Sequence, residues 1–167
     1  MDNTLWVEAY RPSTIDECIL PVEIKKTFKS ILNQGDIPNL LLSGTAGTGK
    51  TTVAKALCNE LDCDVMVING SDEGRSIDVV RNQIKNFAST VSLNESDKYK
   101  NKIIPAIHSR CTVINFVIQN KDKEQLAGLF HKRLCTILEQ ENIDFDAKVV
   151  AELIIKYYPD FRRTINE

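Results

Sequence analysis

Four residues of this chain have the types and the spacing needed to hold a polyphosphate. Gly44, Gly49, Lys50 and Thr51 follow the pattern G-x-x-x-x-G-K-[ST] within the segment SGTAGTGKTT. Together with Gly47, the glycines let successive backbone N–H groups point into one concavity that binds an anion. The Lys50 ammonium can reach the terminal phosphates, and the Thr51 hydroxyl can ligate a Mg²⁺ ion that they share. A purely structural glycine-rich turn is the alternative, but the full pattern favours nucleotide binding.

The segments on either side must position this loop. Residues 39–43 are apolar without alternation, which is typical of a strand buried on both faces. Residues 51–61 have a helical pattern, and the start of that helix adds its positive end beside Lys50. The apolar run 65–69 predicts a second strand. Strand, helix and strand make a right-handed βαβ unit, so the fold class is α/β with a parallel sheet.

The rest of the pattern divides the chain into two parts. A helix is expected over residues 23–34, another after a cap at Ser76 or Asp78, and a third strand over residues 111–117. From residue 120 onward the pattern is that of charged, amphipathic helices without strands. We expect a nucleotide-binding core over residues 1–117 and a small helical domain over residues 118–167.

Composition limits the possible functions. The 167 residues have a net charge of -2, so any nucleic-acid contact requires a local basic cluster. Arg81 and Lys85 share one face of a predicted helix. With Arg75 they form either an ordinary solvated face or a face that follows a nucleic-acid backbone. The five cysteines include no C-x-x-C pair, which favours reduced thiols over zinc ligands. A cytoplasmic protein is expected, since no apolar run approaches a membrane span and the N-terminus lacks a signal-peptide pattern.

The N-terminal segment allows two interpretations. Trp6 and Tyr10 could anchor a surface arm to the core. Alternatively, Tyr10, Arg11 and Pro12, together with residues 18–20, could line one side of a nucleotide base. Sequence position does not decide between them.

Several segments resemble one family along essentially the whole chain. They are WVEAYRPSTIDECILP, GTAGTGKTTVAKAL, NGSDEGRSIDVVRNQIKNFAS, the triplet Ser109-Arg110-Cys111 and the ending PDFRRTI. They are similar to the AAA+ ATPase subunits of DNA-polymerase clamp loaders, namely the large subunit of T4-type bacteriophages and the small subunits of replication factor C. The resemblance implies a three-layer AAA+ core followed by a helical lid domain. It also implies ATP and Mg²⁺ as ligands, and primer–template DNA, the sliding clamp and other loader subunits as partners.

The resemblance also implies roles for individual residues. Arg110 would be an arginine finger, supplied in trans to ATP on a neighbouring subunit. Arg162 would be the sensor 2 arginine, which reports the state of the phosphates from the lid domain to the core, and Lys50, Arg110 and Arg162 would be the catalytic residues. Tyr10 and Arg11 would close over the base, while Arg75 and Arg81 would follow the DNA backbone. The nucleotide contacts around the loop would come from Gly44, Gly47, Thr48, Gly49, Lys50, Thr51 and Thr52.

One part of such an ATPase is missing from the sequence. The Walker B strand should end in Asp-Glu, which holds magnesium and polarises the attacking water. Neither Asp16-Glu17 nor Asp72-Glu73 follows an apolar strand, and the polar sensor 1 residue is absent too. The register of the resemblance places a missing βαβ unit of about 30 residues or more at residues 100 and 101. The family's C-terminal collar is also expected to be absent.

This gap predicts a sheet of about three strands, weakened ATP binding and almost no hydrolysis by this chain alone. The main interpretation is a clamp-loader subunit that opens and loads the clamp using ATP. One alternative is a non-catalytic nucleotide-binding subunit that donates Arg110 to a neighbour. Another is a different AAA+ motor, such as a branch-migration helicase.

Overall fold

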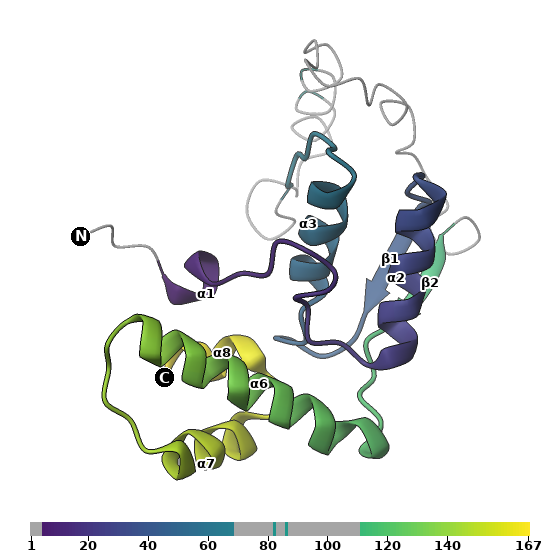
Figure 1. The fold of residues 1–167 in the computed structure, drawn as a ribbon. Helices are drawn as coiled ribbons and strands as arrows, with labels where there is room; N and C mark the ends of the chain where they lie inside the picture. Colours follow the sequence, from purple (N-terminus) through teal and green to yellow (C-terminus); the bar gives the residue numbers. More distant parts are fainter. Residues whose placement is uncertain (1–4, 69–81, 83–85, 87–110) are drawn as a thin grey trace.

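The computed structural model describes residues 5–68, 82, 86 and 111–167 (Figure 1). One group of elements contains a small sheet with two of the helices, and a second group is entirely helical (Figure 1). In chain order, the elements are α1 (Trp6–Ala9), α2 (Val22–Gln34), β1 (Leu40–Ser43), α3 (Lys50–Glu60), β2 (Thr112–Asn115), α6 (Asn120–Gln140), α7 (Ala147–Tyr157) and α8 (Phe161–Asn166).

The sheet consists of β1 and β2, which run parallel with Leu40 opposite Thr112 and Ser43 opposite Asn115. Backbone hydrogen bonds extend the pairing at both ends, from Thr112 N to Asn39 O at 2.8 Å and from Phe116 N to Ser43 O at 2.8 Å. Two of the predicted strands are therefore confirmed, with slightly shorter bounds. The parallel pairing confirms the predicted α/β class.

The strand predicted over residues 65–69 is wrong for its described part. Residues 65–68 form no regular structure, Asn69 lies outside the described residues, and Val65 and Val67 are 49% and 64% exposed. A strand is stable only when its backbone groups bond to a neighbour. The family resemblance implies that the missing βαβ unit would stand in the sheet between β1 and this segment, and its loss would leave the segment without a strand to pair with. The described part of the sheet accordingly has two strands instead of about three.

The same loss explains a second difference. The prediction for β1 was burial on both faces, yet every residue of β1 is only half-buried. Within the described residues β1 has one hydrogen-bonded neighbour, β2. A strand with one paired edge has less of its surface covered than a central strand has.

The main core lies among α2, α3, β2 and the segment that precedes α2. Phe28 is completely buried and its ring centroid lies 6.3 Å from that of Phe116. The spacing of the buried residues on α2 confirms the predicted helix, which ends at Gly35 in a left-handed conformation. The N-terminal segment contributes three buried side chains to the core, Ile15, Cys18 and Leu20. Residues 15–20 are therefore part of the core, whereas Trp6 and Tyr10 are half-buried and lie outside it.

The second group of helices has a core of its own, built on Phe130, Leu134, Val150 and Ile154. Two aspartates begin its shorter helices, because Asp146 Oδ1 accepts from Lys148 N at 2.8 Å and Asp160 Oδ1 accepts from Arg163 N at 3.0 Å. Helix α1 packs against α8, so the N-terminal segment touches both groups. None of the described helices is long and apolar enough to cross a membrane.

Candidate nucleotide-binding site

The glycine-rich segment forms a loop between β1 and α3. It follows Ser43, and Lys50 is the first residue of the helix. Gly44 has φ +139°, and a Cβ there would lie 2.9 Å from the carbonyl oxygen of Phe116, just beyond β2. Only glycine lets the loop leave β1 so close to its neighbour. The first N–H groups of α3 have no intrahelical partner, and the cap residue, Gly49, has no side chain to accept from them.

Two side chains of the loop are engaged with its own backbone. Lys50 Nζ donates to Gly44 O at 3.1 Å and to Thr45 O at 2.6 Å. Thr48 is 3% exposed, and its hydroxyl donates to Thr45 O at 2.9 Å. The side chain of Thr48 therefore stabilises the loop, and its contribution to an anion would come from the backbone. Thr51 is exposed in the first turn of α3, where a hydroxyl is free to meet a metal ion.

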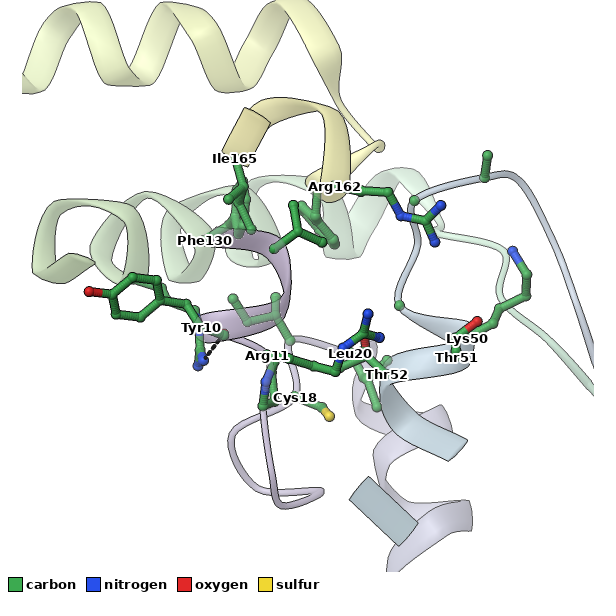
Figure 2. Close-up of a pocket in the computed structure, with 18 residues that line it drawn as sticks. Tyr10, Arg11, Cys18, Leu20, Lys50, Thr51, Thr52, Phe130, Arg162 and Ile165 are labelled. Atoms are coloured by element: carbon green, nitrogen blue, oxygen red, sulfur yellow. Dashed lines mark hydrogen bonds between the residues drawn. The ribbon is translucent and has the colours of Figure 1, made fainter. Parts of the chain in front are cut away.

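A pocket lies between this loop, the N-terminal segment and the helical group (Figure 2). The N-terminal segment provides Tyr10, Arg11, Pro12, Cys18, Ile19 and Leu20. The loop and α3 provide Ala46, Gly47, Gly49, Lys50, Thr51 and Thr52. Helices α6 and α8 provide Phe130, Arg133, Phe161, Arg162 and Ile165. The pocket thus combines a glycine-rich cradle, an apolar wall and several cations, which is the donor set that a nucleotide with a bound cation requires.

Arg11 connects the N-terminal segment to α3. Its Nη1 donates to Thr52 Oγ1 at 3.2 Å, and its guanidinium also pairs with Glu8. The hydrogen bond from Arg11, helped by the charges of Arg11, Lys55 and Arg162, lowers the pKa of Glu8. Tyr10 lies on the same wall, and its hydroxyl donates to Glu141 Oε1 at 2.5 Å. This hydrogen bond raises the pKa of Tyr10.

Arg133 is a site residue that sequence reasoning missed. From α6, its Nη2 donates to Tyr10 O at 2.9 Å and its Nη1 donates to Glu17 O at 3.4 Å. It thereby ties the helical group to the segment that lines the pocket. No local pattern in the sequence marks Arg133, because its partners lie more than 100 positions away and are backbone carbonyls.

Arg162 lines the pocket from α8, and in Figure 2 its side chain extends along the loop on the side where Lys50 and Thr51 lie. The helix packs on α6 through Phe161 and Phe130, whose ring centroids lie 4.5 Å apart with the ring planes tilted by 45°. Asp160, which begins α8, packs directly on Gly47. This contact was not predicted, although the sequence Pro-Asp-Phe-Arg does signal a helix start.

Several predicted site residues lie outside the described residues. They are Arg75, Arg81, Lys85, Ser109 and Arg110. Within the described part of the chain, no group of three or more His, Cys, Asp or Glu residues is arranged to hold a metal ion. The role of Thr51 as a magnesium ligand stays a prediction.

Comparison with known proteins defines the class. Residues 40–119 match the ATPase family associated with various cellular activities, the AAA family. Residues 122–167 match the AAA+ ATPase lid domain of the sliding-clamp-loader large subunit. The chain belongs to the AAA family of ATPases, and it carries a clamp-loader lid.

Individual relatives narrow this class. The chain is 41% identical to the sliding-clamp-loader large subunit of Enterobacteria phage T4 and 38% identical to that of Escherichia phage RB69, in each case over 96% of this chain and 62% of the relative. It is 32% identical to replication factor C subunit 3 of Saccharomyces cerevisiae, over 99% of this chain and 59% of the relative. The chain is a homologue of sliding-clamp-loader large subunits and spans about three fifths of their length.

The alignment lengths agree with an internal gap. The match to the phage T4 protein covers 200 positions but uses 96% of the 167 residues here, or about 160. About 40 positions of the relative therefore have no counterpart in this chain. This is the size expected for one βαβ unit.

Proposed function

We propose that this chain is the ATP-binding subunit of a DNA replication clamp loader. The observation that carries the proposal is the pocket in which three parts of the chain meet. They are the glycine-rich loop between β1 and α3 (residues 44–49), called the phosphate loop from here on, the N-terminal segment, and Arg162 of the clamp-loader lid. We assign residues 1–117 to the nucleotide-binding core and residues 118–167 to the lid.

In this proposal each wall of the pocket has one task. Gly44, Gly47 and Gly49 allow the backbone N–H groups to bind the phosphates, and Lys50 leaves the loop carbonyls to neutralise their charge. Thr51 ligates the Mg²⁺ that bridges the phosphates. Residues 10–12 and 18–20 face the base, and Arg162 brings the charge of the lid to the phosphates.

The partners follow from the resemblance and the relatives. Arg110 would complete the ATP site of a neighbouring subunit in a ring. Arg75, Arg81 and Lys85 would follow the backbone of primer–template DNA without reading its sequence. The clamp-loader ring would open the sliding clamp and load it on the DNA.

A second candidate is favoured by one specific observation. The sequence contains no apolar strand ending in Asp-Glu, and about 40 positions of the phage T4 relative have no counterpart here. Without those carboxylates, nothing polarises the attacking water. The chain would then bind ATP without hydrolysing it and act by donating Arg110 to its neighbour.

The first experiment measures binding of a fluorescent ATP analogue with Mg²⁺. The purified chain should bind it, and Lys50→Ala should weaken binding by about tenfold or more, since a lysine at this position bonds to charged phosphates. Lys26→Ala is the matched control, because Lys26 is an exposed lysine on α2 that pairs with Glu23 away from the pocket. Equal binding by the unmodified chain and Lys50→Ala would refute the proposal.

The second experiment separates the two candidates. ATPase activity is measured in mixtures with an intact clamp-loader subunit, with and without primed DNA. A donor of the arginine finger should raise the activity of its partner, and Arg110→Ala should abolish that increase. DNA-stimulated turnover by this chain alone, lost in Lys50→Ala, would instead favour the complete ATPase.

A further inference from the structure

The lid touches the phosphate loop where Asp160 packs on Gly47. A Cβ placed on Gly47 would lie 1.7 Å from Asp160 Oδ1 and 2.8 Å from Asp160 Cα. Gly47 also has φ +74°, a conformation that side-chain-bearing residues rarely adopt. The backbone of the loop and the carboxyl group of Asp160 are therefore in direct contact, with no room for a side chain between them.

Asp160 is itself held rigidly. Its Oδ1 accepts from Arg163 N at 3.0 Å, and its carbonyl oxygen accepts from both the backbone N and the hydroxyl of Thr164, at 3.2 and 3.0 Å. Thr164 is buried. The residue that contacts the loop is thus the fixed start of α8, and it cannot shift without moving the helix.

Arg162 comes two residues later on the same helix and reaches the pocket. Because α8 begins at Asp160, the distance from Asp160 to Gly47 determines where the guanidinium of Arg162 can reach along the loop. An error of about 1 Å in the placement of a charged group costs much of its interaction with a bound phosphate.

We propose that Asp160 is a positioning residue, which fixes how closely the lid approaches the phosphate loop and so sets the reach of Arg162 toward nucleotide phosphates. The proposal deepens the function proposed above and rests on it. The shape of Asp160 and its cap perform this role, and its negative charge is not required. The absence of a side chain at position 47 is the matching requirement on the loop.

The chain offers matched variants for the test. Asp160→Ala removes both the helix cap and the carboxyl group that contacts Gly47. Asp160→Asn keeps the shape and the cap without the charge. Asp146→Ala is the control, because Asp146 also caps a helix of the lid, α7, but is not among the nearest neighbours of Gly47. Each variant is also made in an Arg162→Ala background.

Binding of the fluorescent ATP analogue gives the first readout. Asp160→Ala should weaken binding by about tenfold, as expected for loss of a hydrogen bond to a charged group. Asp160→Asn and Asp146→Ala should stay within about twofold of the unmodified chain, as expected for changes that leave that bond intact. In the Arg162→Ala background, Asp160→Ala should have no further effect, because it acts through the residue already removed. Equal losses for Asp160→Ala and Asp146→Ala, or equal effects in the two backgrounds, would overturn the proposal.

The second readout needs no nucleotide. Trp6 is the single tryptophan of the chain and belongs to α1, which packs against α8. Its emission spectrum should shift in Asp160→Ala and remain unchanged in Asp160→Asn and Asp146→Ala. If the unmodified chain binds no nucleotide, the proposed function fails, while the Trp6 spectrum still tests the contact. An unshifted spectrum in Asp160→Ala would overturn the contact itself.

Discussion

The guanidinium of Arg11 donates to the hydroxyl of Thr52 at 3.2 Å, which connects residues 41 positions apart across one wall of the pocket. Thr52 is the second threonine after Lys50, so this contact links the N-terminal segment to the turn of α3 that follows the phosphate loop. Arg11 is simultaneously paired with Glu8. The N-terminal wall of the pocket and α3 are therefore joined by one side chain.

Thr52→Val should weaken this link and lower the free energy of unfolding by about 0.5–1.5 kcal/mol, the usual net value of one hydrogen bond. Valine keeps the shape of threonine and removes the acceptor. Urea denaturation followed by circular dichroism measures the change. Thr136→Val is the control, because Thr136 is exposed on α6 and its hydroxyl bonds only within its own helix. Equal losses in the two variants would contradict a special role for the Arg11 contact.

Arg133→Met should lower the free energy of unfolding by about 1.5–3 kcal/mol, because it removes hydrogen bonds from a charged group to the carbonyls of Tyr10 and Glu17. Methionine retains the length and apolar stem of arginine. Lys132→Met, at the neighbouring exposed position, should change stability by less than about 0.5 kcal/mol. Nucleotide binding should weaken in Arg133→Met alone. A variant as stable as Lys132→Met would show that the link across the pocket contributes nothing.

Phe28→Ala should lower the free energy of unfolding by about 3–5 kcal/mol, the range for a fully buried aromatic residue. Phe28 packs against Phe116, which lies just beyond β2, so the cavity would loosen the strand pair that supports the phosphate loop. The reduced sheet leaves few other contacts to compensate. Thermal melting should show a strong decrease for Phe28→Ala and a smaller one for Phe28→Leu. A melting temperature close to that of the unmodified chain would contradict this account of the core.

The buried thiol of Cys18 should make the free energy of unfolding decrease at alkaline pH. Burial raises the pKa of its thiol from 9.0 to about 11, with smaller opposing effects from Lys25 and Arg133. The folded state therefore retains the proton that the unfolded state has lost, so stability is complete below about pH 9 and falls as the pH rises toward 11. Urea midpoints measured from pH 8 to 11 should fall less steeply in Cys18→Ala than in the unmodified chain. Parallel slopes would contradict the prediction.

Local patterns in the sequence predicted the parts of the fold that depend on local physics. The turn from β1 to α3, the buried stripe of α2 and the helices after residue 120 follow from glycine positions and helical spacing. The prediction of a strand over residues 65–69 was wrong because a strand depends on non-local pairing. The composition of this segment is that of a strand, but strand formation depends on a neighbour that composition does not reveal.

The residues of the candidate site also fall into two groups, those found from local spacing and those brought together by packing. Lys50 and Thr51 are fixed relative to the loop by their place in the chain, so their spacing was sufficient to find them. Arg133 and Asp160 belong to the site because of packing between segments far apart in the sequence. The cap at Asp160 is a local signal, whereas its contact with Gly47 exists only once the lid has docked.

The pairing of β1 with β2 determines which parts of the fold stay connected when other strands are missing. The phosphate loop follows β1, and the first helix of the lid, α6, follows β2. Both parts of the pocket are therefore attached to the same pair of strands. By the family resemblance, the lost positions would lie beside β1 on its unpaired edge and would include the water-activating carboxylates. Loss of those strands would separate the binding of a nucleotide from its hydrolysis. Such a loss would leave a chain that keeps the glycine-rich loop and the lid but lacks the groups that hydrolyse a bound nucleotide.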